Sequence, residues 1–90
     1  MYERKTIVRN KSGLHLRPAA EFVARAALSK SDITIRRVES GDAYNAKSIV
    51  MLLHLGIAKG TEIEIAAKGE DETETVDALI GLIESGFGDL

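Results

Sequence analysis

A histidine and an arginine at a predicted helix start in segment 13–20 could together bind and transfer a phosphoryl group. His15 lies just before a predicted helix, Pro18 is expected to open that helix, and Arg17 lies between them. The amide N–H groups of a helix start, here those of Leu16 and Arg17, attract anions. A guanidinium group matches phosphate in shape and charge. Because a neutral imidazole is nucleophilic near neutral pH, the segment predicts a histidine that accepts a phosphoryl group.

The same residues have a simpler interpretation. A histidine before a helix is often a polar cap or a solvated loop residue, and spacing alone does not decide between the two. The rest of the chain lacks cysteine, has His54 as its second and last histidine, and has no acidic cluster spaced like a metal site. No nucleotide-binding loop is present. We therefore expect no metal and no cofactor, and a phosphoryl group that comes from another protein.

The elements that position His15 follow from the pattern of apolar and turn residues. Strands are expected over 2–9, 33–36 and 61–67, with a short one after the turn at 39–42. Helices are expected over about 16–28, 46–53 and 71–85. The order β-α-β-β-α-β-α predicts an α+β fold, with a four-stranded antiparallel sheet and three helices on one face.

Apolar stripes indicate which helix faces meet the sheet. The last helix has a stripe of Val76, Leu79, Ile80 and Ile83, and the last strand has Ile63, Ile65 and Ala67 on one face. The first helix is expected to bury Ala20, Val23, Ala24 and Ala27, with Phe22 and Ala26 widening the stripe. Gly13 suits a turn, Gly56 suits the end of the second helix, and only residues 86–90 are expected to lack order.

Composition excludes several classes of protein. The 90 residues have a net charge of −2 and are 44% hydrophobic, which fits one domain spanning residues 1–90. Without a basic block, binding to nucleic acid is not expected. The apolar runs are too short for membrane insertion and no export signal is visible, so we expect a cytoplasmic protein. The absence of cysteine fits such a reducing compartment.

Several segments resemble the HPr family, the histidine-containing phosphocarriers of the bacterial phosphotransferase system. The first is Gly-Leu-His-Leu-Arg-Pro-Ala-Ala at 13–20, and the second is Asn-Ala-Lys-Ser-Ile-Val at 45–50, followed by Leu-Gly-Ile at 55–57. A third covers 60–65 and 69–71 and precedes the C-terminal helix. The resemblance extends over nearly the whole chain in the same order. It implies the open-faced β-sandwich of that family.

The resemblance also implies a phosphoryl carrier rather than an enzyme. Enzyme I, phosphorylated by phosphoenolpyruvate, would load Nδ1 of His15, and Arg17 would stabilise the phosphate. The acceptor would be a histidine of an enzyme IIA domain in sugar uptake, and we expect the carrier to be a monomer. The implied docking residues, some of which must also serve the core, are Leu16, Ala20, Lys47, Ile49, Val50 and Leu53.

Ser48 matches the serine that HPr kinase/phosphorylase modifies in many relatives. We expect it in the first turn of the second helix, where a phosphate would meet amide N–H groups. An ordinary capping serine is the alternative. Other functions also stay open: a nitrogen-type regulatory carrier, a protein that binds a transcriptional regulator through phosphorylated Ser48, or a generic small ligand-binding domain.

Three residues depart from the family pattern. Leu16 stands where many relatives have a small or polar residue, and Met51 stands where glycine is common. His54 has no counterpart in the matching motifs. These departures affect the expected docking surface more than the expected chemistry.

Overall fold

Four strands and three α-helices make up the described part of the chain, which is residues 1–88 of a computed structural model. The elements are β1 (Tyr2–Ile7), α1 (Leu16–Ala27), β2 (Asp32–Arg37), β3 (Ala43–Asn45), α2 (Ile49–Leu55), β4 (Glu62–Lys68) and α3 (Glu72–Glu84). A single turn of 3-10 helix, η1 (Gly86–Gly88), follows α3. This order is the one that the sequence predicted.

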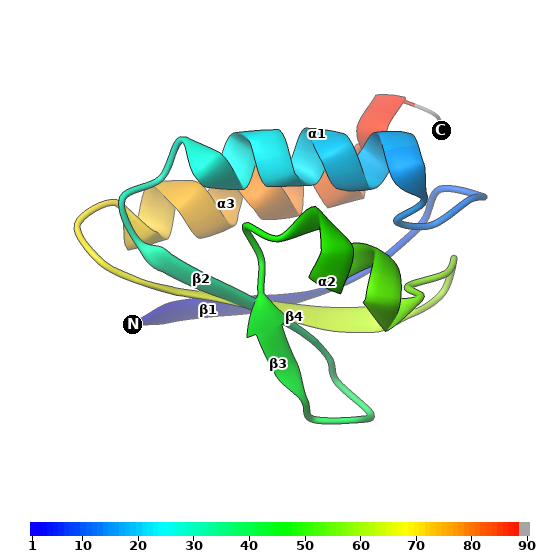
Figure 1. Ribbon diagram of the computed structural model, residues 1–90, viewed down its shortest axis with the longest axis horizontal. Coiled ribbons are helices and arrows are strands. Elements are labelled where there is room, and N and C mark those ends of the chain that lie inside the picture. The colour runs from blue at the N-terminus through cyan, green and yellow to red at the C-terminus, as the bar shows by residue number, and fades with distance from the viewer. Residues whose placement is uncertain (89–90) are drawn as a thin grey trace.

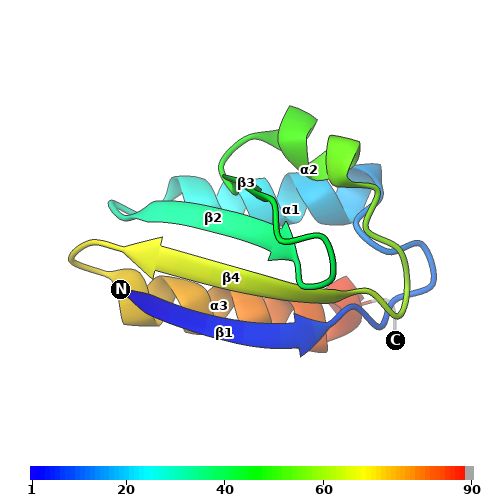
Figure 2. The ribbon, with the colours of Figure 1, turned by 90° about the horizontal axis from the view of Figure 1, so that it is seen from below.

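The sheet has the strand order β1-β4-β2-β3, and every neighbouring pair is antiparallel. The central strand β4 aligns Ile65 with Arg4 of β1 on one side and with Ile35 of β2 on the other. All three helices cover one face of the sheet, and α1 and α3 lie side by side (Figure 1). The opposite face is open (Figure 2). The predicted open-faced sandwich is confirmed.

Most of the predicted core is buried between the sheet and the helices. Ile63, Ile65 and Ala67 of β4 are buried, as is the α3 stripe of Val76, Leu79, Ile80 and Ile83. Burying these aliphatic side chains provides the main stabilisation of the fold, at about 25 cal/mol per Å² of apolar area. Among residues 1–88, no helix is long and apolar enough to cross a membrane.

The buried face of α1 is rotated about the helix axis relative to the predicted apolar stripe, so that prediction is wrong. Ala20, Ala24 and Ala27 are exposed, whereas Phe22 and Ala26 are fully buried. Phe22 determines this orientation because one phenyl ring buries far more apolar area than an alanine methyl group does. The exposed alanines leave one side of α1 open to solvent along its length.

The start of α2 also differs from the prediction. The helix begins at Ile49 rather than at residue 46, because the N–H of Ala46 donates to the carbonyl of Ile33 in the sheet (2.9 Å). Ser48 is therefore the N-cap and not a first-turn residue. Gly56 ends the helix in the left-handed conformation with φ of 61°, as predicted.

The C-terminal residues are more ordered than the sequence indicated. Phe87 lies in η1 with its side chain buried against the core, so the expected lack of order from residue 86 onward is wrong for residues 86–88. Residues 89 and 90 lie outside the described part of the chain. A buried aromatic ring contributes enough apolar contact to hold such a short segment.

A polar cluster ties together the loops at the far end of α1 from His15. Asp71 accepts hydrogen bonds from the hydroxyls of Ser31 (2.6 Å) and Ser29 (2.8 Å). Thr75 donates to Ser29 Oγ (2.9 Å) from inside the core. The hydrogen bonds from Ser31 and Ser29 hold the pKa of Asp71 well below its usual range. The cluster fixes the C-terminal end of α1 against the start of α3.

Candidate functional site

The loop before α1 is held in place by the loop after α2. The N–H of Leu14 donates to the carbonyl of Ile57 (2.9 Å), and Leu14 itself is buried. Gly13 has φ of +62°, and its Cα faces the backbone of Ile57 and Ala58 so closely that a β-carbon would collide with the Ile57 carbonyl oxygen. These contacts fix the backbone immediately before His15.

Replacing Gly13 with alanine is expected to destabilise the protein by about 2 kcal/mol or more. The left-handed conformation alone costs a β-carbon about 1–2 kcal/mol, and residues 57–58 must also move away. Urea unfolding measures the loss. The control is Gly41→Ala, where φ is +79° but nothing lies within 4 Å of the added carbon. Equal losses for the two variants would show that the close approach at Gly13 has no importance.

His15 is the N-cap of α1, with φ of −77° and ψ of −173°. Its carbonyl accepts the first helical hydrogen bond, from the N–H of Ala19 (2.8 Å). Its side chain is exposed, makes no capping hydrogen bond, and has no hydrogen-bonding or ionic partner among residues 1–88. The imidazole therefore stands at the positive end of α1, open to an incoming group.

The proline of this segment is the third helical residue, Pro18, and not the first as predicted. The position still suits proline because the first-turn N–H groups have no helical acceptor, so a missing N–H costs nothing there. Leu16 and Arg17 form the first two positions, and their amides lie directly after His15. The helix start thus presents backbone donors beside the imidazole.

Arg17 lies on the exposed side of the first turn of α1. Its Nη1 donates to Glu21 Oε1 at 2.7 Å in an i,i+4 ion pair. An exposed pair of this kind contributes only about 0.3–0.5 kcal/mol to stability. Glu21 was not identified from the sequence, although its four-residue spacing from Arg17 is the signal for such a pair.

Ser48 caps α2 through its hydroxyl, which accepts a hydrogen bond from the N–H of Met51 (3.3 Å). The side chain is half-buried. This geometry matches the ordinary capping role that was the alternative to regulation. It does not exclude modification, because a phosphate at an N-cap also meets helix amides and a favourable dipole.

Exposed apolar side chains lie on α1, which His15 caps, and on the neighbouring helix α2. Leu16 is 60% exposed, Val50 68% and Leu53 41%. Helix α2 packs against α1, and the loop that follows it pairs with the loop before His15. Exposed apolar side chains that gather on neighbouring helices are typical of interaction sites. We refer to Leu16, Ala20, Val50, Met51 and Leu53 as the apolar patch.

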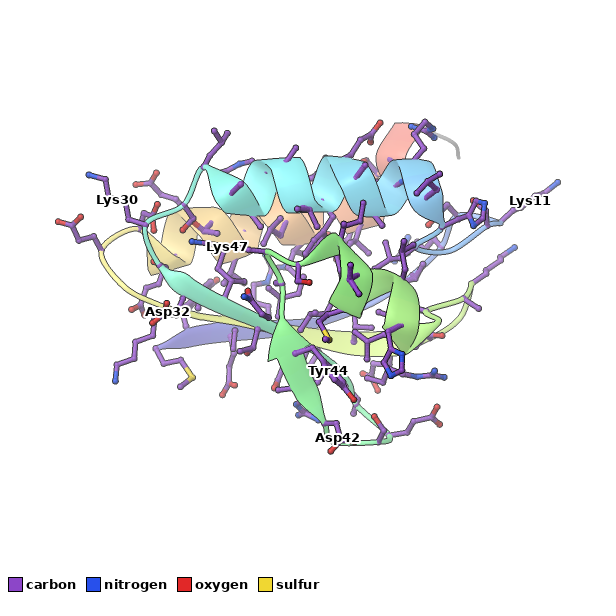
Figure 3. The ribbon with its side chains drawn as sticks, viewed as in Figure 1. Lys11, Lys30, Asp32, Asp42, Tyr44 and Lys47 are labelled. Carbon is purple, nitrogen blue, oxygen red and sulfur yellow. The ribbon has the colours of Figure 1, made fainter. Side chains whose placement is uncertain are left out.

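Two other predicted docking residues are less accessible. Ile49 is partly buried and packs against the core. Lys47 donates through Nζ to the carbonyl of Ser29 (2.9 Å) at the C-terminal end of α1. Figure 3 shows Lys47 reaching toward that end, whereas Lys11 extends from the loop before α1 at the opposite end. The structure therefore does not bring Lys47 to His15.

The second histidine of the chain, His54, lies at the C-terminal end of α2. His54 is in the last turn and contacts the ring of Tyr44 edge-on, with ring centroids 6.2 Å apart.

Within residues 1–88, no group of three or more His, Asp or Glu side chains could hold a metal ion. The candidate site has an exposed imidazole beside the first amides of α1, and Arg17 follows in the same turn; these are groups suited to an anion.

Comparison with known proteins agrees with this chemistry. Residues 2–85 match the family model described as the PTS HPr component phosphorylation site. The chain belongs to the HPr family. Phosphocarrier protein HPr of Vibrio cholerae is 39% identical over 84 residues, which cover 93% of this chain and 96% of the relative. Phosphocarrier protein NPr of Proteus mirabilis is 38% identical over 84 residues, covering 93% and 92%.

Solved structures of HPr-family proteins share the fold. HPr-C-His of Thermoanaerobacter tengcongensis has a TM-score of 0.95 and 41% identity, covering 100% of this chain and 99% of that one. Crh of Bacillus subtilis, described as a domain-swapping intertwined dimer, has a TM-score of 0.74 and 40% identity, covering 96% and 97%. Since HPr, NPr and Crh all match, membership of the HPr family identifies a phosphocarrier without fixing its branch.

Proposed function

We propose that His15 accepts a phosphoryl group from phosphorylated Enzyme I and passes it to a histidine of an enzyme IIA domain in sugar uptake. The observation that carries the proposal is the exposed imidazole at the N-cap of α1, next to the amide of Leu16 and the side chain of Arg17. Residues 1–90 would act as one carrier domain. The source of the phosphoryl group would be phosphoenolpyruvate, through Enzyme I.

The transfer is a displacement at phosphorus. A nitrogen of His15, Nδ1 on the family resemblance, attacks the phosphoryl group, and the phosphorus–nitrogen bond to the donor histidine breaks. The positive end of α1 and the guanidinium stabilise the charged oxygens during this exchange. A phosphorus–nitrogen bond is labile, so the group can leave again for the next acceptor, whereas a serine ester would hold it.

Truncating Arg17 to alanine is expected to slow phosphoryl transfer by about tenfold or more. A charge-assisted hydrogen bond to phosphate contributes about 1.5–3 kcal/mol, whereas the exposed pair with Glu21 contributes little to stability. The transfer rate and the melting temperature are measured on the same sample. Glu21→Ala is the control, because it removes the ion pair but keeps the guanidinium. Unchanged transfer by Arg17→Ala would place the arginine outside the site.

The apolar patch is proposed as the surface that receives Enzyme I and the IIA domain. Its exposed side chains lie on α1 beside His15 and on the neighbouring helix α2, which fits a transient interface with an apolar core and a polar rim. Ile49 would support this surface from the core side. Lys47 would add a positive charge beside the N-terminal end of α2. Ser48 is proposed as a regulatory phosphorylation site for HPr kinase/phosphorylase, since it lies two residues from Val50.

The relatives support alternatives to sugar uptake. The match to NPr of Proteus mirabilis favours a nitrogen-type regulatory branch as the second candidate. The match to Crh, named for catabolite repression, favours binding of a transcriptional regulator through phosphorylated Ser48. We further propose a cytoplasmic protein that acts as a monomer, although the Crh structure is a dimer. Loading of His15 by Enzyme I is expected of the sugar-uptake and nitrogen-type carriers. It is not required of a protein that acts through phosphorylated Ser48.

A further inference from the structure

The side chain of Asn10 lies fully buried in the loop that leads to His15. Its Nδ2 donates to the carbonyl of Gly13 at 2.7 Å, and its Oδ1 is buried without a hydrogen-bond partner among residues 1–88. The alternative amide orientation would set Oδ1 against the Gly13 carbonyl oxygen, so the hydrogen bond fixes the assignment. An unsatisfied buried acceptor is unfavourable and calls for an explanation beyond packing.

A short chain of contacts connects Asn10 with His15. Besides the side-chain bond, the N–H of Gly13 donates to the carbonyl of Asn10 (3.1 Å), so two hydrogen bonds close the turn over residues 10–13. The turn places Gly13 in close contact with the backbone of Ile57. The next N–H, that of Leu14, donates to the Ile57 carbonyl. His15 follows as the extended N-cap. The direction of the imidazole and of the first α1 amides therefore depends on this turn.

We propose that Asn10 is a positioning residue for phosphoryl transfer at His15, acting through the turn over residues 10–13. This inference rests on the proposed function. Without the Nδ2 donor, the buried carbonyl of Gly13 loses this partner, and we expect the turn to shift Gly13 relative to Ile57. The imidazole and the α1 amides then lose their common alignment, and a misplacement of about 1 Å can slow a reaction by up to a hundredfold.

The effect should appear in the rate of transfer and not in the docking of partners. The apolar patch lies on α1 and α2, whereas the Asn10 carboxamide bonds to Gly13 in the loop before α1. Loss of alignment therefore lowers the maximum rate of His15 loading. The concentration of phosphorylated Enzyme I that gives half of that rate should stay the same.

The test compares two variants with a control of similar size and burial. Asn10→Ala removes the carboxamide, and Asn10→Asp keeps its shape but replaces the donor with an acceptor. Thr75→Val removes a buried hydrogen bond to Ser29 in the polar cluster, far from the loop before α1. Loading is measured by rapid quenching with phosphorylated Enzyme I. It is measured again with phosphoramidate, a small donor that needs no docking surface and releases ammonia when its phosphorus–nitrogen bond breaks.

Both Asn10 variants are expected to lose about tenfold in maximum rate with either donor, with the half-saturating concentration of Enzyme I within twofold of wild type. Thr75→Val should melt at a lower temperature but load at the wild-type rate. Wild-type maximum rates in folded Asn10 variants would overturn the inference, as would a change confined to the half-saturating concentration. Failure of both Asn10 variants to fold, where Thr75→Val folds, would make Asn10 purely structural. A wild-type chain that is not loaded at all would instead refute the proposed function.

Discussion

Replacing His15 with alanine is expected to abolish phosphorylation of this chain by phosphorylated Enzyme I. The imidazole at the N-cap of α1 is the proposed nucleophile, so no residual transfer should remain above background. The variant should fold normally, because the His15 side chain is exposed and makes no capping hydrogen bond. Labelling from radioactive phosphoenolpyruvate in the presence of Enzyme I measures the result.

His54 provides the matched control for this substitution. It is exposed, lies in the last turn of α2, and its ring packs edge-on against Tyr44. His54→Ala should therefore retain full labelling, and a double variant should behave like His15→Ala alone. Full labelling of His15→Ala would refute the assignment of the acceptor, whatever the behaviour of His54→Ala.

Replacing Ser48 with aspartate is expected to slow loading from Enzyme I by about a hundredfold. The carboxylate would stand two residues from Val50 in the apolar patch, where an incoming partner must remove water from the charge. An unpaired charge at the desolvated part of an interface costs about 2–5 kcal/mol. Stability should not fall, because aspartate is as good an N-cap as serine and accepts the same N–H of Met51.

Two further substitutions separate charge from capping. Ser48→Asn keeps the cap without the charge, so it should load at the wild-type rate. Ser48→Ala removes the cap and should cost about 1 kcal/mol of stability while loading normally. Equal loading by wild type and Ser48→Asp would reject the inhibitory role and leave Ser48 as a capping residue only.

Regular apolar patterns made much of the fold predictable from the sequence. In β4 and α3, large aliphatic residues recur with the period of a strand and of a helix, and each pattern has one interpretation. In α1 the repeating residues are mostly alanines, so the pattern hardly distinguishes its faces, and burial of Phe22 decided the orientation. The start of α2 depended on a hydrogen bond from Ala46 to Ile33, a contact between distant segments that local propensity does not contain.

The candidate site was likewise predictable where local signals define it and unpredictable where distant segments meet. The position of His15 at a helix start was predictable because Pro18 and the alanine-rich run that follows are local signals. Two contacts came only from tertiary structure: Lys47 is held by Ser29, away from His15, and the Asn10 side chain is buried within the loop before α1. Local signals thus locate the candidate phosphoryl acceptor, while the packing of distant loops determines how its backbone is held.

The most direct test of this account is to locate the phosphate on the wild-type chain after incubation with phosphoenolpyruvate and Enzyme I. Mass spectrometry of proteolytic peptides, prepared at alkaline pH, would identify the modified residue, and brief acid treatment would test the bond. We expect one phosphate per chain, on the peptide that contains His15, stable in alkali and lost in acid. An acid-stable phosphate on the peptide that contains Ser48, or no phosphate at all, would contradict the assignment of this chain as a histidine phosphocarrier.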